Sequence, residues 1–269
     1  MRLLGLVIRR LSHISARIGG FFHELTQLLN SLLPAILPTT ELTKLIQGYY
    51  ENGYRGAGKY YPTEVQGTGL AVWEETVLTQ YNISSGTVLV LGAGVGRESI
   101  EFARRGLLVI GLDISQEALQ LAVRTTQEQH IKALFIQGSF YQIPTILGCV
   151  DLIFLSGIMY SAIPGCRLRQ EWLKKLSLYL KEGGLAVLSF YINRAEESQL
   201  AKHIRLFNSW LSRLPGANPS YQPGDFVAHD HFLHAFLDEK ELRTELAETG
   251  ATTVQINWDE QFAVLAWRG

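Results

Sequence analysis

The chain has 269 residues, of which 47% are hydrophobic. This length suits one α/β domain with an extension, and the composition argues against intrinsic disorder. Lys and Arg total 24 and Asp and Glu total 25, a formal net charge of −1 that removes the electrostatic basis for wrapping nucleic acid. Cys149 and Cys166 are too few for a disulfide framework and are not spaced as a metal knuckle, so we expect a reducing, cytoplasmic location.

The first 40 residues have the pattern of a basic amphipathic helix. Apolar residues recur at helical spacing, and arginines occupy the opposite face. Glu24 is the only acidic residue before Glu41, and Pro34 and Pro38 are expected to end the helix. The segment contains no uncharged run of the ~20 residues that cross a bilayer.

Three interpretations of this segment are open. Residues 1–45 form a helical extension that docks on the domain or on a partner subunit, or residues 1–37 make peripheral contact with an anionic membrane, or the segment is an organelle transit peptide.

The remainder, residues 46–269, alternates helical patterns with apolar runs. A segment rich in Gly and Tyr, 47–62, is predicted to be a loop that contacts a flat ligand. Helices are predicted over 69–80, 98–105, 115–129, 168–180 and 239–249, with the fourth ending at Gly183-Gly184. Strands are predicted over 87–91, 107–112, 133–137, 150–155, 185–191, 252–258 and 261–267. The last two flank Asp259-Glu260 as a hairpin, so we expect an α/β fold with a mostly parallel sheet and one antiparallel strand.

A glycine-rich turn joins the first predicted strand to the next helix. The turn reads Gly92-Ala93-Gly94-Val95-Gly96, and the second strand ends in Asp113. Glycines there let a ligand rest on bare backbone, and an acid about 20 residues further on suits the hydroxyls of a ribose. Arg97 stands where a dinucleotide fingerprint has its third glycine. The pattern therefore favours a phosphate-free nucleoside such as S-adenosylmethionine over a nicotinamide dinucleotide with a redox role.

Three motifs together resemble the class I S-adenosylmethionine-dependent methyltransferases of the small-molecule type. They are Val88–Glu98, Val109–Ser115 and Leu180–Gly184, and the resemblance extends over residues 65–269. It implies a Rossmann-like, seven-stranded, mostly parallel sheet with one antiparallel strand and helices on both faces, beside the N-terminal helical extension. It also implies S-adenosyl-L-methionine as cofactor. The residues that the resemblance assigns to the cofactor are Gly92, Ala93, Gly94, Gly96, Asp113, Ile114, Gly138, Ser139, Phe140, Ser156 and Gly157.

The resemblance also implies which part of the cofactor each of these residues contacts. The glycines lie against the methionine and ribose, and Asp113 accepts from the ribose hydroxyls. Ile114 packs on the adenine, residues 138–140 face its amino edge, and residues 156–157 border the sulfonium.

Two positions depart from the family pattern. Val90 stands where the family usually has an acid two residues before the first glycine, which removes an anchor near the methionine ammonium. Ser139 replaces the acid often found after the third strand, although its hydroxyl can still form hydrogen bonds. These departures predict that the Tyr-rich segment adds contacts or that the affinity for the cofactor is modest.

An insert over residues 193–236 is predicted to be a lid on the acceptor side of the domain. Its aromatic and polar residues suit a small, partly apolar acceptor. A general base is needed only for a protonated acceptor, and His231, His234 and Tyr160 are the candidates. With His229, the two histidines could bind a transition metal, but no second ligand cluster is evident and no metal is predicted.

The predicted function is methyl transfer from S-adenosylmethionine to oxygen or nitrogen of a small or lipophilic metabolite in the cytoplasm. The alternative is a methyltransferase fold that has lost its chemistry and acts as a binding or regulatory module, for which Val90 is the best support. Residues 155–160 lack the Asn-Pro-Pro-aromatic signature of amino-methylating enzymes, so no nucleic-acid partner is expected. The identity of the acceptor and the oligomeric state stay open.

Overall fold

The computed structural model describes Thr26 and residues 28–52, 69–144, 148–155, 157–194, 199–228 and 231–267. Most of the amphipathic segment, most of the Gly- and Tyr-rich segment, Ser156 and His229 lie outside the described residues.

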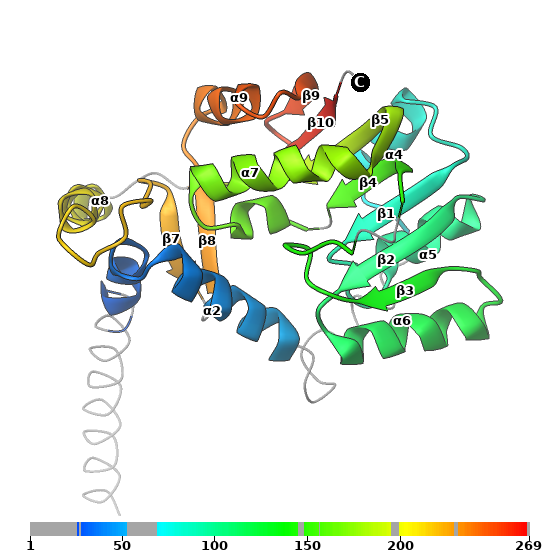
Figure 1. Ribbon diagram of the computed structural model, residues 1–269, viewed down its shortest axis with the longest axis horizontal. Helices are drawn as coiled ribbons and strands as arrows, with labels where there is room; N and C mark the ends of the chain where they lie inside the picture. Colours follow the sequence, from blue (N-terminus) through cyan, green and yellow to red (C-terminus); the bar gives the residue numbers. More distant parts are fainter. Residues whose placement is uncertain are drawn as a thin grey trace, which may run out of the picture.

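A seven-stranded sheet forms the centre of the domain (Figure 1). Its order is β3-β2-β1-β4-β5-β10-β9, and β10 runs antiparallel to both of its neighbours. The pairs that join β3 to β5 are all parallel. The strands are β1 (Thr87–Leu91), β2 (Leu108–Asp113), β3 (Leu134–Gln137), β4 (Val150–Leu155), β5 (Leu180–Ser189), β9 (Thr252–Asn257) and β10 (Phe262–Ala266). The predicted sheet and its final hairpin are confirmed.

Helices cover both faces of this sheet because its strands are apolar on both sides. Along β1, Leu89 and Leu91 pack in one hydrophobic cluster, and Val88 and Val90 pack in the other. The first cluster includes residues of α7 (Cys166–Leu176) and α9 (Glu239–Ala247), and the second includes residues of α4 (Val72–Gln80) and α5 (Arg97–Arg104). The remaining helix of this part, α6 (Gln116–Glu128), packs beside β3. Such two-sided burial is typical of parallel sheets.

The predicted end of one helix is wrong. The helix expected over 168–180 ends at Leu176, and the short 3₁₀ helix η3 (Ser177–Tyr179) follows it. The glycine pair expected to stop that helix instead lies in β5, where the register shifts between Val150 and Leu152 of the paired strand β4. Gly183, with φ of +76°, takes the left-handed conformation within this irregularity rather than after the helix.

The insert predicted as a lid supplies two of the three strands of a second, smaller sheet, whose third strand, β6 (Tyr191–Ile192), directly precedes it. The other two strands are β7 (Asp225–Ala228) and β8 (His231–Phe236), and the order is β6-β8-β7. The helix α8 (Gln199–Leu211) precedes the loop that was expected around residues 216–224. The insert is therefore a structured part of the molecule rather than a loop alone.

The described N-terminal residues pack against this smaller sheet. Residues 28–36 are helical and include Pro34, so only the break at Pro38 agrees with the prediction, and α2 (Thr39–Asn52) follows. Leu42 and Ile46 of α2 are buried against β7, β8 and the turn after β4. The boundary expected between residues 45 and 46 falls inside α2, because that helix buries its apolar face on the insert. Within the described residues, no helix has the length and hydropathy to span a bilayer.

Candidate functional site

A cavity of about 350 Å³ lies at the carboxyl ends of the first four strands. This edge is where open α/β sheets bind ligands, next to the reversal of strand order between β1 and β4. The cofactor residues assigned by resemblance that line it are Gly92, Ala93, Gly94, Asp113, Ile114, Gly138, Ser139, Phe140 and Gly157. Further lining residues, which the sequence did not assign, are Ile46, Gln47, Tyr50, Val95, Arg97, Glu98, Leu112, Tyr141, Ile158 and Met159.

The glycine-rich turn forms one wall of the cavity as nearly bare backbone. Gly92 and Gly94 have φ values of +73° and +51°, which favour glycine, and the Gly92 N–H donates to the Leu112 carbonyl at 2.9 Å. A Cβ on Gly92 would lie 3.3 Å from the Met159 sulfur. A side chain at Gly92 would therefore crowd the cavity and strain the turn.

Gly96 has a different role from the other two glycines. It does not line the cavity, and it precedes α5 with φ of +89°. A Cβ there would lie 2.9 Å from the Cβ of Ala122 on α6. Gly96 therefore permits close packing between α5 and α6 rather than contact with a ligand.

Asp113 is held at the cavity wall by backbone donors. The Gly94 N–H donates to Oδ2 and the Ser115 N–H donates to Oδ1, each at 2.8 Å. Burial raises the pKa of Asp113 above its ordinary value, while the N–H groups of Ser115, Gly94 and Ile114 oppose that change. Because each carboxylate oxygen has a further lone pair, the group can also accept hydrogen bonds from a ligand.

A charged cluster forms a second wall, at the start of α5. The Arg97 guanidinium binds both carboxylate oxygens of Glu74 at 2.8 Å and one oxygen of Glu98 at 2.6 Å. Burial lowers the pKa of Arg97, but the two carboxylates outweigh burial and raise it, so the group stays charged. Glu74 and Glu98 are 2% and 4% exposed, and two carboxylates around one guanidinium leave a net negative charge.

This cluster supplies the carboxylate that the family usually has at the position of Val90. The valine side chain is fully buried in the second hydrophobic cluster, whereas Glu98, which lines the cavity, supplies a carboxylate there. The sequence signal was present, since Glu98 is the second residue of the helix that directly follows the glycine turn. What the sequence could not show is that Glu74 lies beside it.

Two of the three predicted general bases lie away from the cavity. Tyr160 is fully buried, and its hydroxyl donates to Glu245 at 2.5 Å. His234 is also fully buried, with Nδ1 2.8 Å from Asp225 and Nε2 3.3 Å from Glu241. Neither lines the cavity, so their positions argue against direct proton transfer with a ligand bound there.

The third candidate, His231, lies behind the cavity wall. Its ring stacks on Tyr49 with centroids 4.2 Å apart, and Tyr50 meets it edge-on at 6.1 Å. Tyr50 itself lines the cavity. His231 is therefore separated from the cavity by one aromatic residue of α2.

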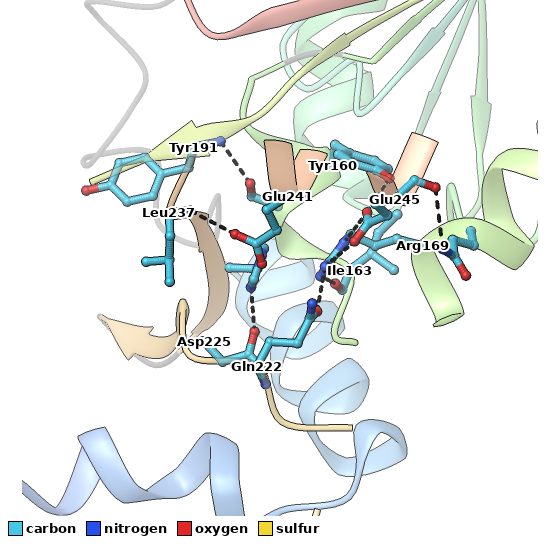
Figure 2. A network of polar contacts seen from close by, with 12 residues as sticks. Tyr160, Ile163, Arg169, Tyr191, Gln222, Asp225, Leu237, Glu241 and Glu245 are labelled. Carbon is cyan, nitrogen blue, oxygen red and sulfur yellow. Dashed lines mark hydrogen bonds and ion pairs between the residues drawn. The ribbon is translucent and has the colours of Figure 1, made fainter. Parts of the chain in front are cut away.

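Arg169 is the centre of a buried polar network that joins the insert to the main domain (Figure 2). Its guanidinium binds Glu245 of α9 through Nε and Nη2, each at 2.7 Å. It also donates to Gln222 at 2.6 Å and to the Ile163 carbonyl at 3.1 Å. The Gln222 N–H in turn donates to Asp225 at 2.8 Å. His234 thus links the insert to Glu241 of α9, and Tyr160 supports the Glu245 carboxylate that holds Arg169.

The histidine of this network predicts a pH dependence of stability. Burial and the Arg169 charge lower the pKa of His234, but the hydrogen bonds to Asp225 and Glu241 outweigh them, and the net pKa is raised. A raised folded-state pKa gives stability that is present below the unfolded value and is lost as pH rises through the folded value. The wild type should therefore lose more unfolding free energy than His234→Gln between pH 6 and pH 8, in urea unfolding at each pH. Equal losses would show that His234 does not gain a proton on folding.

Comparisons with known proteins agree with this geometry. Residues 88–184 match the family model described as a methyltransferase domain. A 1,6-didemethyltoxoflavin-N1-methyltransferase of Burkholderia thailandensis, solved with its substrate and S-adenosylhomocysteine, has a TM-score of 0.58 at 13% identity and covers 87% of this chain and 92% of its own. A search of curated proteins finds no significant match.

Two further solved structures have similar folds. An S-adenosylmethionine-dependent methyltransferase of Clostridium acetobutylicum has a TM-score of 0.54 at 13% identity and covers 82% of this chain and 97% of its own. One of Methanosarcina mazei has a TM-score of 0.54 at 19% identity, covering 72% and 98%. Residues 88–184 therefore match a methyltransferase domain, and the fold that contains them is similar to that of solved S-adenosylmethionine-dependent methyltransferases. S-adenosylmethionine is the cofactor of this class.

Proposed function

We propose that the protein transfers the methyl group of S-adenosylmethionine to an oxygen or nitrogen of a small, partly apolar metabolite. The observation that carries the proposal is one cavity that combines a bare glycine turn, the fixed carboxylate of Asp113 and the buried carboxylate of Glu98. This arrangement suits a ligand that has no phosphate groups. Arg97 is engaged by two carboxylates, so it does not offer a cationic site for a diphosphate.

Each part of the cavity suits one part of the cofactor. Asp113 would accept from the ribose hydroxyls, and the turn at Gly92–Gly94 would lie along the methionine chain. Ile114 and Phe140 would pack on the adenine. Glu98 would attract the methionine ammonium, and would thus replace the acid that the family usually has at the position of Val90. When bound, the cofactor supplies an activated methyl group, so the protein mainly positions the reactants and excludes water.

The acceptor side of the cavity has an apolar and aromatic wall. Ile46 and Tyr50 of α2 face the same cavity as Tyr141 and Met159, which suits an acceptor with a flat or apolar body. Burial raises the pKa of Tyr141, whose hydroxyl donates to the Ala162 carbonyl, so it stays protonated. His231, behind Tyr50, is the predicted base that lies nearest to the wall. On sequence grounds we also propose a cytoplasmic location with membrane contact through residues 1–37.

The proposal is tested with the full chain in two steps. Calorimetric titration with S-adenosylmethionine should show binding at one site. Incubation with methyl-labelled cofactor and a metabolite extract should then move label into a small molecule. Failure to bind would overturn the proposal, whereas binding without transfer to any acceptor would favour the alternative binding module.

Glu98→Gln should weaken cofactor binding about ten-fold, because it removes a charge-assisted contact from a buried position. The ammonium is common to S-adenosylmethionine and S-adenosylhomocysteine, so titration should show a similar loss for both. Glu101→Gln, on the same helix and in a pair with Arg104, is the control and should bind normally. A loss confined to S-adenosylmethionine would place Glu98 at the sulfonium instead of the ammonium.

A further inference from the structure

The outer side of α8 presents an apolar stripe to solvent. Leu200, Phe207 and Trp210 recur at the spacing of one helical face and are 68%, 48% and 55% exposed. Leu206 beside them and Leu214 just after the helix are also exposed. Monomeric proteins rarely leave so many large apolar side chains together at the surface without an interaction partner.

A second exposed apolar group lies directly beside α8. The side-chain amide of Asn208 on α8 donates to the Ser31 carbonyl at 2.6 Å, and that of Asn218 donates to the Pro34 carbonyl at 2.8 Å. These bonds hold helical residues 28–36 against the insert, and Figure 1 shows the two segments at the same end of the molecule. Leu28, Leu29 and Ile36 of that segment are exposed. We call α8 with residues 28–36 the terminal surface.

The charge of the terminal surface is one-sided. Residues 28–40 and 199–224 contain no Asp or Glu, although the chain has 25 acidic residues. The exposed Lys202 and Arg213 supply cations near the apolar side chains, Arg205 lies on the same helix, and Glu196 and Glu197 come before α8 in the sequence. Cations around an apolar stripe are the pattern of helices that lie in the interface of an anionic membrane.

We propose that the terminal surface docks on an anionic lipid bilayer. A bilayer accepts exposed Leu, Phe and Trp side chains without shape complementarity, and the cations then meet lipid phosphates. The composition of residues 1–25 supports this occupant over a protein partner. That segment has four arginines and one glutamate and lies just before residues 28–36 in the sequence, so a second pattern typical of membrane contact is continuous with the terminal surface along the chain. The inference does not depend on which acceptor is methylated.

Vesicle co-sedimentation of the full chain tests the proposal. The protein should bind vesicles of phosphatidylcholine and phosphatidylglycerol in equal parts, bind phosphatidylcholine alone more weakly, and dissociate as salt rises. The double variant Lys202→Gln with Arg213→Gln should weaken vesicle binding on the order of 30-fold, because two cations that are attracted to the anionic surface are lost. Phe207→Ser with Trp210→Ser should also weaken it at least ten-fold, because the apolar contact is lost.

Three controls make the result specific. Leu178→Ser, which removes a leucine after α7 that is even more exposed, should bind vesicles normally. Trp210→Phe should keep binding but lose the fluorescence quenching that brominated lipids cause in the wild type. Cofactor titration should be unchanged in every variant, which separates this proposal from the proposed function. The proposal is wrong if the α8 variants bind vesicles like the wild type, or if they instead abolish a dimer seen by sedimentation.

Discussion

Replacing Glu245 by glutamine is expected to lower the free energy of unfolding by about 3 kcal/mol, because it leaves a buried guanidinium without its counter-charge. Arg169 is 0% exposed and donates two hydrogen bonds to this one carboxylate. Burial raises the pKa of Glu245, but the Arg169 charge and hydrogen bonds outweigh it and hold the pKa below its ordinary value. Since a depressed carboxyl pKa stabilises the fold at neutral pH, this contribution should fade in acid. Urea unfolding of both proteins at pH 7 measures the difference.

The same helix offers a matched control for this variant. Glu239 pairs with Arg243 one turn away at the surface of α9, so Glu239→Gln should change stability by less than about 0.5 kcal/mol. Replacing both buried partners, with Glu245→Leu and Arg169→Met together, should recover much of the loss, since no unpaired charge remains. If Glu245→Gln unfolds like the wild type, the network does not anchor the insert.

Replacing Asp113 by alanine is expected to weaken cofactor binding by about 1–3 kcal/mol, since the hydrogen bonds from the ribose hydroxyls would be lost. The carboxylate also orders the turn through Gly94, so the loss includes a less well-defined cavity wall. Asp113→Asn separates the two effects, because an amide oxygen still accepts from Gly94 but carries no charge. Calorimetric titration with S-adenosylmethionine measures both variants.

The control for Asp113 lies on the neighbouring helix. Glu117 is an exposed acid in the first turn of α6, so Glu117→Ala removes a charge near the same strand end without touching the cavity. Its affinity for the cofactor should equal that of the wild type. Unchanged affinity in Asp113→Ala would mean that the ribose lies elsewhere and would contradict the assignment of this cavity.

Local sequence patterns were sufficient for the sheet and for much of the cavity. Apolar runs of strand length, separated by helical patterns, predicted the seven strands, and the short Asp259-Glu260 connection predicted the antiparallel β10. The turn at Gly92–Gly96 and the acid at Asp113 are close in sequence, and their spacing alone placed them together. The end of α7 was missed because a glycine in left-handed conformation serves a strand irregularity as readily as a helix end.

The acceptor side shows where sequence patterns fail. Tyr160 and His234 were chosen for their chemistry and position along the chain, but their partners Glu245, Asp225 and Glu241 come from other elements and bury them. In the same way, the Arg97 pair with Glu74 spans 23 positions in sequence. No periodicity reports such contacts, since they depend on how separate elements pack.

The amino-acid sequence alone was enough to predict the class of fold, the glycine turn and the acid at Asp113, because these depend on hydrophobic period and on spacing within one βαβ unit. Which ionisable side chains face the cavity, and which are held in the network around Arg169, became known only from the folded structure. Burial and charge pairing could not be predicted because they arise between elements that are distant in the chain. The sequence does not distinguish a histidine or glutamate at the cavity from one in the buried network, because its pKa and accessibility depend on the neighbours that the fold places around it.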